Sequence, residues 1–568
     1  MARWTAAKEP NPHYSDLLTR EVTKDPLLGK LLAGRGLEDF EGAKAYFRSD
    51  LQSLHNPFRM KDMEAAVERI EKARIAGEQL MIYGDYDVDG TTSVATLMLF
   101  LKDRLPHLEA YVPDRYKEGY GLSFEGINLA EEMGITLIIA LDCGTKAFDQ
   151  IAHAKQKGID VIVCDHHRPE ETLPNAVAVL NPKRKDCPYP YKELSGCGVG
   201  FKLCQALTQH WGLQPEQHLY PLMELCAVSI AADMVPTTGE NRTIAQHGLH
   251  YLRQGPFNQG LKHLIFFGKK SPAGLTFRDL GFFVGPRINA AGRISQGLDA
   301  VKLLLGSSAE EIQTLTAAIE AQNTERRAAQ QTYSEQALAA LDTANYPNST
   351  VVYHPDWLKG VIGLVASRLL DHHYRPTVVL TKSGDTLAGS ARSVDGFDMY
   401  AALEACQDHL IQFGGHTMAA GMTMHEAQLP QFQQAFEAYA TAHLSEEQKE
   451  RNLVYHAEAD LADFSDRFYG IFRQMEPFGP GNEEPVFLLR NLRDAGSTRA
   501  VGTDNAHLKL HVAQEGSQAT MSGIAFGHGE LEAEVKSGSR FDALATLTEN
   551  HFNGTTSIEL MVIDIRLQ

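Results

Sequence analysis

One short stretch constrains this chain more than any other. Residues 81–90 read Met-Ile-Tyr-Gly-Asp-Tyr-Asp-Val-Asp-Gly, so an apolar strand signal leads directly into three carboxylates, Asp85, Asp87 and Asp89. In extended or gently turning backbone, side chains two positions apart point the same way, and these carboxylates therefore converge. Their mutual repulsion predicts a bound cation, and oxygen ligands suit a hard divalent ion.

Two other interpretations of this acidic stretch exist. Asp-x-Asp-x-Asp-Gly also opens a calcium-binding EF-hand loop, but Thr96 stands where that loop needs a bidentate Glu. An EF-hand loop also follows a helix, whereas residues 80–83 predict a strand. A solvated acidic turn is the commoner meaning of such a run taken alone. The residues that follow along the chain favour the metal site.

Length, charge and apolar runs limit the class of protein. A chain of 568 residues is too long for one ordinary core and predicts several domains. The net charge of -19 confines any nucleic-acid site to a local basic groove. No apolar run reaches the ~18–20 residues of a membrane span and the first residues lack a signal-peptide core, so we expect a cytoplasmic protein without membrane contact. Seven cysteines without a Cys-x-x-Cys pair argue against disulfides and structural zinc.

A repeated strand, loop and helix pattern runs from about residue 78 to about residue 236. Its apolar strands, at 80–83, 136–141 and 160–164, are continuous rather than alternating. Burial on both faces predicts a parallel sheet that is covered by helices on each side. In such a sheet, ligands gather beyond the carboxyl ends of the strands.

Each of these strands is followed by metal-type ligands. Asp142 follows the second strand, and His166 and His167 follow the third. Parallel neighbours deliver these ends to one place. Asp233 follows an apolar helix expected over 222–230, and we assign it to the same centre as a fourth cluster.

The order of these motifs resembles the DHH phosphoesterase superfamily, which includes RecJ exonucleases, family II pyrophosphatases and small-oligonucleotide phosphodiesterases. The matching motifs are Asp85-x-Asp87-x-Asp89-Gly90, Asp142-Cys-Gly, Asp165-His166-His167 and Asp233. The resemblance implies a centre of two Mn²⁺ or Mg²⁺ ions. Asp142 would bridge the ions, Asp87 would hold the first, and Asp89, His166 and Asp233 would hold the second. Tyr83 stands where relatives have a further His, and Asp85 is the candidate to replace it.

The chemistry agrees with this ligand set. Two ions roughly 3.5–4 Å apart can activate water and neutralise charge on the attacking and leaving oxygens. Ligands rich in carboxylate suit manganese or magnesium better than zinc. We expect catalytic roles for Asp85, Asp142 and His167; the last would stabilise the transferring phosphate or protonate the leaving oxygen, or would merely brace its loop.

Phosphate-binding residues are expected further along the chain. Two arginines lie in a Gly/Ala-rich turn at 285–294, and RecJ proteins carry a similar segment. Gly414-Gly-His416-x-x-Ala-Ala-Gly421, in a second α/β pattern, is similar to the DHHA1 signature. Tight-turn glycines and a satisfied His are the alternative there. The expected phosphate ligands are Arg287, Asn289, Arg293, Ser390, Arg392 and His416.

The tail from about residue 454 has short alternating apolar runs that predict an antiparallel β domain with one solvated face. It resembles the OB-fold of RecJ, and OB-folds bind single strands through a basic groove and aromatic platforms. The aromatic candidates are Phe526 and Phe552. The weaker groove candidates are Lys359, Arg368, Arg499 and Lys509.

The expected fold is therefore α/β, with a parallel-sheet DHH domain and a second α/β (DHHA1) domain joined by a long helix, plus an OB-like β-barrel. The long helix is expected over 309–345, which contains no Gly or Pro. The five expected parts are an N-terminal helical segment (1–75), the DHH domain (76–305), the connecting helix (306–345), the DHHA1 domain (346–450) and the OB-like domain (451–568).

The RecJ resemblance implies a metal-dependent 5′→3′ exonuclease that degrades single-stranded DNA to mononucleotides in DNA repair and recombination. Two alternatives remain: a small-oligonucleotide or cyclic-dinucleotide phosphodiesterase, which needs no third β domain, and a non-catalytic replication scaffold, which needs no ligand set. The family implies single-strand-binding protein and a helicase as partners, and a multi-domain chain of this kind can work as a monomer.

Overall fold

The computed structural model describes residues 2–568 except 256, 295, 307 and 553–554, and it leaves the side chains of 551–555 undescribed. Contacts divide the chain into two compact units. The smaller unit contains residues 1–50, 450–478 and 482–568, and the larger contains residues 51–449 and 479–481. Within the described ranges, no helix is long and apolar enough to cross a membrane.

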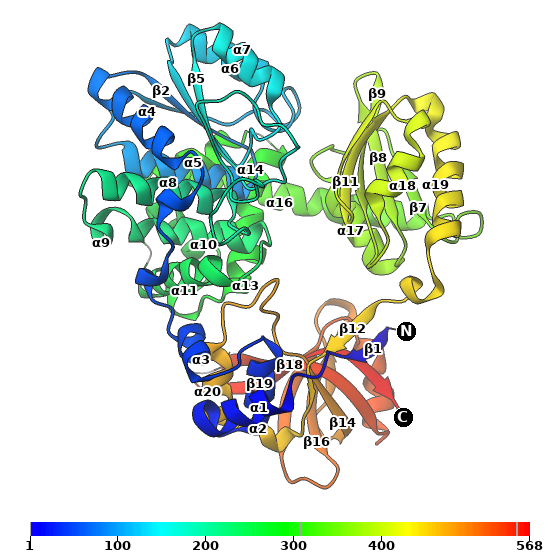
Figure 1. The fold of residues 1–568 in the computed structure, drawn as a ribbon. Helices are drawn as coiled ribbons and strands as arrows, with labels where there is room; N and C mark the ends of the chain where they lie inside the picture. The colour runs from blue at the N-terminus through cyan, green and yellow to red at the C-terminus, as the bar shows by residue number, and fades with distance from the viewer. Residues whose placement is uncertain (1, 256, 295, 307, 553–554) are drawn as a thin grey trace. The chain divides into compact units, whose positions relative to one another are not determined.

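The larger unit begins with a parallel sheet in the strand order β3-β2-β4-β5-β6 (Figure 1). Strands β2, β4 and β5 are buried on both faces, which confirms the prediction from continuous apolar runs. Leu80 and Ile82 pack with helices on one face, whereas Met81 and Tyr83 pack with helices on the other. The elements are β2 (Leu80–Gly84), β3 (Leu108–Tyr111), β4 (Leu137–Leu141), β5 (Asp160–Cys164) and β6 (Ala178–Leu180), with α4 (Met63–Ala76), α5 (Val88–Leu101) and α8 (Gly196–His210) on the first face and α6 (Phe124–Glu132) and α7 (Phe148–Gln156) on the second.

Further helices follow the sheet and carry the fourth acidic motif. The segment expected as a Gly/Ala-rich turn is the helix α14, so that prediction was wrong. Its glycines allow close packing rather than a turn: a Cβ atom on Gly292 would lie 2.5 Å from the carbonyl oxygen of Tyr86. The helices are α10 (Met223–Ala232), α11 (Gly239–Gln254), α12 (Gln259–Phe267), the π-helical turn η6 (Leu280–Val284), α14 (Gly285–Ile294) and α15 (Leu298–Leu305).

The expected long helix is α16 (Ala309–Ala339), and it leads to the second sheet (Figure 1). It ends before the predicted Asn345, because the Asp342 carboxylate accepts the Asn345 backbone N–H at 3.1 Å and forms a local turn. At its start, the Ser308 hydroxyl accepts the N–H of Glu311 at 3.2 Å and caps the helix.

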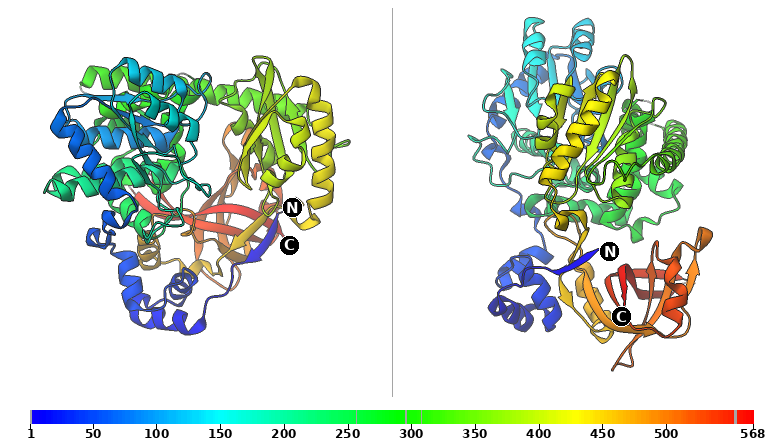
Figure 2. Two further views of the ribbon diagram at one scale, coloured as in Figure 1. Left: turned by 45° about the horizontal axis from the view of Figure 1, so that its top comes forward. Right: turned by 90° about the vertical axis from the view of Figure 1, so that its right-hand side faces the viewer.

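The second sheet has the order β10-β11-β9-β8-β7, and its β7–β8 pair is parallel while the other pairs are antiparallel. Helix α17 covers one face, and helices α18 and α19 cover the other (Figures 1 and 2). The elements are β7 (Thr350–Tyr353), α17 (Ile362–His372), β8 (Thr377–Ser383), β9 (Thr386–Arg392), α18 (Met399–Ala405), β10 (Gln412–Gly415), β11 (Ala419–Met424) and α19 (Leu429–His443).

The smaller unit contains a β-barrel. Its sheet has the order β13-β14-β18-β19-β17-β16-β15, and an additional β14–β16 pairing closes it. The prediction of a purely antiparallel domain was wrong, because β17 and β19 run parallel. A closed ring of β14, β18, β19, β17 and β16 has an odd number of strands, so at least one neighbouring pair must be parallel. The strands are β13 (Ala457–Glu458), β14 (Phe487–Asp494), β15 (Arg499–Val501), β16 (His507–Gln514), β17 (Thr520–Ala525), β18 (Phe541–Phe552) and β19 (Thr555–Leu567).

The two ends of the chain share the core of this smaller unit. Strand β1 (Arg3–Ala6) pairs in parallel with β12 (Asn452–Tyr455), and the Trp4 indole N–H donates to Asp564 at 2.7 Å. Leu28 and Leu31 of α2 (Pro26–Gly34) belong to one hydrophobic cluster with the barrel residues. Residues 1–50 are therefore an integral part of the β-barrel unit.

Candidate metal centre

Three acidic side chains follow directly from three adjacent strand ends. Gly84 pairs with Leu141, and Leu141 pairs with Cys164, so β2, β4 and β5 end in register. The next residues, Asp85, Asp142 and Asp165, consequently lie along one edge of the sheet. Asp142 has a φ of 58°, in the sparsely populated left-handed region, and such strain is typical of functional positions.

The imidazole of His166 lies among three carboxylates. Its Nε2 is 3.2 Å from Asp142 Oδ1, 3.7 Å from Asp89 Oδ2 and 3.6 Å from Asp233 Oδ2. Ligand atoms of Asp89, His166 and Asp233 all lie within 4.8 Å of one another, as do those of Asp142, His166 and His167. The structure thus brings together four of the predicted ligands: Asp89, Asp142, His166 and Asp233. His166 follows strand β5 and Asp233 follows helix α10, so the ends of these two elements lie close together.

The donor set fits divalent cations. Asp142 Oδ1 and Asp85 Oδ2 are buried and have no hydrogen-bond partner within the described part of the chain. Burial, together with the neighbouring carboxylates of Asp89 and Asp87, raises the pKa of Asp142 and of Asp233 well above the usual range for Asp. A cation reverses this cost, because it favours the ionised carboxylates that surround it.

Asp89 is held by the start of helix α8. Its carboxylate accepts the backbone N–H groups of Gly196 at 2.6 Å and Cys197 at 2.8 Å, and the hydroxyl of Ser229 at 2.7 Å. Ser195 caps the helix and lies 2.7 Å from Ser229. A Cβ atom on Gly196 would lie 2.6 Å from the Asp142 Cβ, so only glycine fits there. Sequence reasoning missed this support, although the small residues at 195–200 are its visible signal.

Asp85 and Asp87 lie in the same loop but outside the two ligand groups. Asp85 is fully buried, and its Oδ1 receives a long contact from the Gly121 N–H at 3.4 Å. Asp87 caps helix α5 by accepting the Gly90 N–H at 3.1 Å. The Tyr83 hydroxyl donates to the Gly121 carbonyl at 2.8 Å, so this side chain is already engaged. That Asp85 and Asp87 bind metal remains a prediction.

His167 forms a close pair with Asp165. Its Nδ1 lies 2.8 Å from Asp165 Oδ1, and that carboxylate also accepts the backbone N–H groups of Thr145 and His166. Burial opposes the imidazolium, but the hydrogen bond to Asp165 and its charge outweigh burial and raise the pKa of His167 to about 9. Nε2 lies 3.3 Å from the Tyr120 hydroxyl, which also donates to the Asp142 carbonyl at 3.0 Å.

The loop that carries Tyr120 is a part of the site that sequence reasoning missed. The Tyr120 ring meets the Tyr86 ring edge-on at 6.0 Å, and the Arg115 guanidinium lies 4.1 Å from the Tyr86 ring centroid. Glu118 braces this loop, because its carboxylate accepts the hydroxyls of Tyr111 and Ser123 at 2.8 and 2.5 Å. The loop's alternating Tyr, Gly and charged residues have no periodic pattern by which they could be recognised.

Several guanidinium groups converge beside the acidic centre. Burial and the charges of Arg115, Arg326 and Arg392 lower the pKa of Arg293 to about 9. Arg293 Nη1 donates to the Gly360 carbonyl at 2.7 Å, which joins α14 to the start of the second α/β domain. Closely spaced like charges of this kind favour an anion such as phosphate, and binding of one by Arg293 remains a prediction.

Ser390 and Arg392 lie together at the start of helix α17. Arg392 Nη1 donates to the Ser390 hydroxyl at 3.1 Å. A Cβ atom on Gly363 would lie 2.9 Å from the Ser390 hydroxyl and 3.0 Å from Arg392 Nη2, so a glycine keeps this position open. Binding of phosphate by this pair remains a prediction.

The positions of the other predicted phosphate and groove residues give less support for a role in binding phosphate or DNA. Arg287 forms an ion pair with Glu320 and stacks 3.8 Å from the Phe283 ring centroid. His416 is exposed, and its Nδ1 accepts the Met418 N–H at 3.2 Å. The remaining ones are Asn289, half-buried on α14; Lys359 and Arg368, exposed near α17; and Arg499 and Lys509, which face each other across β15 and β16 of the smaller unit. Their roles remain predictions, and the side chain of Phe552 lies outside the described residues.

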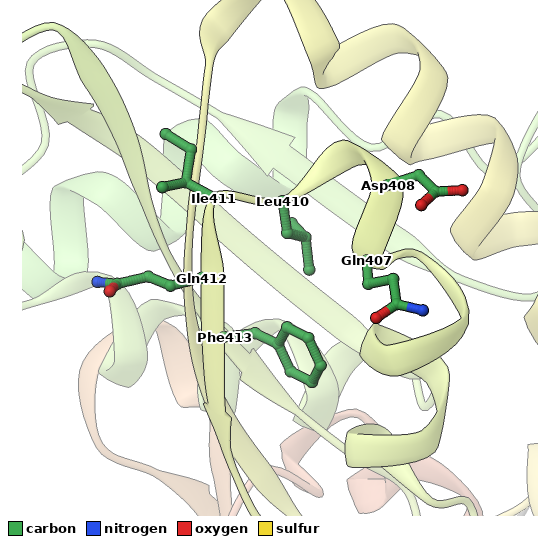
Figure 3. Close-up of a pocket in the computed structure, with 6 residues that line it drawn as sticks. All are labelled: Gln407, Asp408, Leu410, Ile411, Gln412 and Phe413. Atoms are coloured by element: carbon green, nitrogen blue, oxygen red, sulfur yellow. The ribbon is translucent and has the colours of Figure 1, made fainter.

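A surface pocket beside the edge strand β10 is separate from this centre (Figure 3). Leu410, Phe413 and Gln407 point to the same side of the strand there, while Ile411 and Gln412 point to the other (Figure 3). No predicted site residue lines this pocket.

Three family models match the chain. They are the DHH family, N-terminal domain, over residues 79–230; the DHHA1 domain, over residues 347–442; and the RecJ OB domain, over residues 455–564. These matches confirm the sequence-based resemblance.

Full-length relatives and solved structures agree with these matches. The single-stranded-DNA-specific exonuclease RecJ of Bacillus subtilis is 35% identical over 99% of this chain and 70% of its own length. The corresponding RecJ of Salmonella typhimurium is 34% identical over 96% of this chain and 97% of its own length. The crystal structure of RecJ from Thermus thermophilus in complex with Mn²⁺ is similar with a TM-score of 0.83 and 26% identity, over 99% of this chain and 79% of that chain. Its Mg²⁺ complex gives a TM-score of 0.76 at the same identity, over 99% and 78%.

Proposed function

The chain belongs to the RecJ family of single-stranded-DNA-specific exonucleases, and we propose that its buried acidic centre binds two Mn²⁺ or Mg²⁺ ions and hydrolyses single-stranded DNA from the 5′ end to mononucleotides. One observation supports this most: ligand atoms converge within 4.8 Å in each of two groups that share His166, one with Asp89 and Asp233 and one with Asp142 and His167, and buried carboxylate oxygens are left without partners among the described residues. The proposed process is DNA repair and recombination.

Six side chains would hold the two ions. When bound, the ions activate the attacking water and offset charge on the phosphate. The protein holds the carboxylates close together, the bound cations would favour their ionised forms, and the start of α8 holds Asp89 in place. The proposed ligands are Asp85, Asp87, Asp89, Asp142, His166 and Asp233.

His167 is the proposed proton donor of the reaction. Asp165 binds its Nδ1 and stabilises the imidazolium, which leaves the Nε2 proton free to be donated. The Tyr120 hydroxyl, whose own proton is donated to the Asp142 carbonyl, can accept from Nε2 and limits rotation of the ring. Through Nε2, the imidazolium would stabilise the transferring phosphate or protonate the leaving oxygen.

The arginine cluster is the proposed site for the terminal phosphate of the strand, whereas the 5′→3′ direction follows the family resemblance alone. Arg293 and Arg392 would bind the phosphate at the 5′ terminus, with Arg115 nearby, and would thereby fix how far the strand enters. Arg499 and Lys509 of the barrel are a second, weaker place for the strand. The preference for single-stranded DNA is proposed because the relatives are single-stranded-DNA-specific exonucleases.

The two alternatives from the sequence are disfavoured. A phosphodiesterase for short oligonucleotides leaves the β-barrel that matches the RecJ OB domain without a role. A non-catalytic scaffold leaves the convergent ligand set without a role.

The proposed setting is the cytoplasm, with the DNA substrate, and the proposed working form is a monomer. Single-strand-binding protein and a helicase are the proposed partners that deliver the strand, since a net charge of -19 makes unaided capture of DNA weak. A pull-down that recovers neither protein would contradict this part of the proposal.

A time course on a long oligonucleotide with a 3′ label tests the activity. Mn²⁺ should give a shortening ladder on the single strand, EDTA should abolish it, and the matched duplex should be spared. A dinucleotide that is cleaved rapidly while the long strand stays intact would contradict the proposal.

A further inference from the structure

Asp233 differs from Asp89 in how it is held at the metal centre. Three donors fix the Asp89 carboxylate, whereas within the described part of the chain no N–H or O–H group donates a hydrogen bond to the Asp233 carboxylate. Its Oδ2 lies 3.6 Å from His166 Nε2, which is beyond hydrogen-bond distance. The position of this proposed ligand therefore depends on the backbone on either side of it.

The backbone that follows Asp233 has an unusual conformation. Met234 has a φ of 56°, in the left-handed region that residues other than glycine rarely adopt. Such a conformation persists only where the surrounding structure holds it. Two side chains do so at Pro236, whose carbonyl accepts the Tyr191 hydroxyl at 3.1 Å and the Asn241 side-chain amide at 3.0 Å.

A further anchor of this backbone comes from a distant part of the sequence. The Thr237 N–H donates to the Pro480 carbonyl at 2.7 Å. Gly479 permits this approach, because a Cβ atom there would lie 2.2 Å from Thr237 Oγ1. Gly481 has a φ of 74°, which glycine adopts without strain. Contacts place residues 479–481 in the larger unit, although the residues before and after them belong to the smaller one. We call residues 479–481 the strap.

We propose that the strap is a positioning element of the metal centre. By holding the Thr237 N–H, Pro480 fixes the backbone that carries Asp233 and thereby sets the affinity for the ion that Asp233 binds. This inference rests on the proposed function, in which Asp233 is a metal ligand. Groups that hold a ligand in place typically change metal affinity by about 10- to 100-fold when they are altered. The other ion should not depend on the strap, because its proposed ligands Asp85 and Asp87 lie on a separate loop.

A role that is confined to the shape of the linker has less support. The Asn482 side chain, which is buried, donates to the Met475 carbonyl at 3.0 Å and to the Pro477 carbonyl at 2.7 Å. These bonds close the linker within the smaller unit. The hydrogen bond from Thr237 is therefore an addition that serves the segment after Asp233.

Titration of the full chain with Mn²⁺, followed by electron paramagnetic resonance of the free ion, tests the proposal. The variant is Gly479→Ala; Gly479 lies outside the left-handed region, so the new methyl group acts through its contact with Thr237. The matched control is Gly274→Ala, also in the larger unit, where an added Cβ atom has no neighbour within 4 Å.

A double variant, Gly479→Ala/Thr237→Ala, removes the oxygen that the new methyl group meets. Thr237 Oγ1 is buried and has no hydrogen-bond partner among the described residues, so its removal breaks no such bond. The double variant keeps the Thr237 backbone N–H and is compared with Thr237→Ala alone.

We expect the unaltered protein to bind two Mn²⁺ ions. In Gly479→Ala, one Kd should rise roughly tenfold or more while the other stays within about twofold. Gly274→Ala should leave both within about twofold, and the double variant should match Thr237→Ala. Unchanged Kd values in Gly479→Ala, an equal weakening of both ions, or a double variant that does not recover would overturn the strap but leave the two-ion function intact. An unaltered protein that binds fewer than two ions would overturn the proposed function, and the strap with it.

Discussion

Nδ1 of His167 lies 2.8 Å from Oδ1 of Asp165, and this contact favours the charged form of His167, whose other ring nitrogen faces Tyr120. The carboxylate is itself fixed by the backbone N–H groups of Thr145 at 2.9 Å and His166 at 2.7 Å. Because Asp165 follows β5 directly, the sheet positions the pair rather than a mobile loop. His167 is therefore a preorganised, positively charged imidazole.

This pair predicts a pH-dependent contribution to stability in the metal-free protein. The pKa of His167 is raised from the ordinary 6.5 to about 9, so its stabilising effect is complete below about pH 6.5 and is lost as the pH rises through about 9. We expect His167→Gln to lower the urea midpoint in EDTA most at about pH 6 and least near pH 10. A difference between variant and unaltered protein that is the same at every pH would contradict the assignment.

Asp142→Asn should separate activity from stability. Removal of the Asp142 carboxylate, a proposed metal ligand, is expected to lower hydrolysis by about 1,000-fold. Burial and neighbouring carboxylates raise the pKa of Asp142, so its charged form destabilises the metal-free fold increasingly as the pH rises. In EDTA the variant should therefore unfold at a temperature equal to or above that of the unaltered protein, by a margin that grows with pH. Substantial residual hydrolysis by Asp142→Asn would contradict the proposed two-metal mechanism.

Gly196→Ala tests the packing of helix α8 against the centre. The new methyl group would lie 2.6 Å from the Asp142 Cβ, and both Asp142 and the N–H groups that hold Asp89 must then shift. We expect a loss of activity of about 100-fold, since misplaced groups of this kind are costly. Gly198→Ala, on the same helix with its nearest neighbour at 3.4 Å, is the matched control and should retain most activity. Equal effects of the two variants would argue against a role of Gly196 in keeping Asp142 and Asp89 in place.

Tyr120→Phe should affect turnover more than binding. The change removes the hydroxyl that contacts His167 Nε2 at 3.3 Å but keeps the ring against Tyr86. A hydrogen bond worth about 0.5–1.5 kcal/mol corresponds to a drop in kcat of roughly 2- to 13-fold, with KM within twofold. Tyr120→Ala, which also removes the ring, should raise KM as well. If Tyr120→Phe raises KM and spares kcat, the hydroxyl does not act through His167.

A buried ion pair on helix α8 predicts a stability effect. Lys202 Nζ donates to Glu240 at 2.9 Å and to the His55 carbonyl at 2.8 Å, and both charged side chains are almost fully buried. Lys202→Met leaves the Glu240 charge without its partner and should destabilise the protein by about 3–5 kcal/mol in urea unfolding. Lys185→Met, at an exposed pair 4.0 Å apart, is the control and should leave the midpoint unchanged. Equal midpoints for the two variants would show that the buried pair contributes little.

Local patterns were sufficient for the sheet and for its ligands. The strands β2, β4 and β5 are continuous apolar runs, and their ends carry Asp85, Asp142 and His166 by covalent connection. Once the sheet is known to be parallel, these ends must meet at one edge. The long helix was also predictable, because a run without Gly or Pro has few alternatives.

Contacts between distant segments decided the rest. Helix α14 was expected as a turn, because glycines that serve close packing against Tyr86 look like turn residues in the sequence. The hydrogen bonds that hold Asp89 join residues more than a hundred positions apart in the sequence. The loop with Arg115 and Tyr120 has no periodic pattern that would predict its place. Closure of an odd-membered ring imposes the parallel strand pair in the barrel.

The amino-acid sequence by itself determined the class of chemistry, since the identity of the ligands and their attachment to strand ends are local properties. Only the tertiary structure decided which donors hold Asp89, which charge state His167 adopts, and that residues 1–50 complete the barrel unit. Hydrogen bonds, burial and like-charge repulsion act through space, and these interactions exist only once the chain has folded.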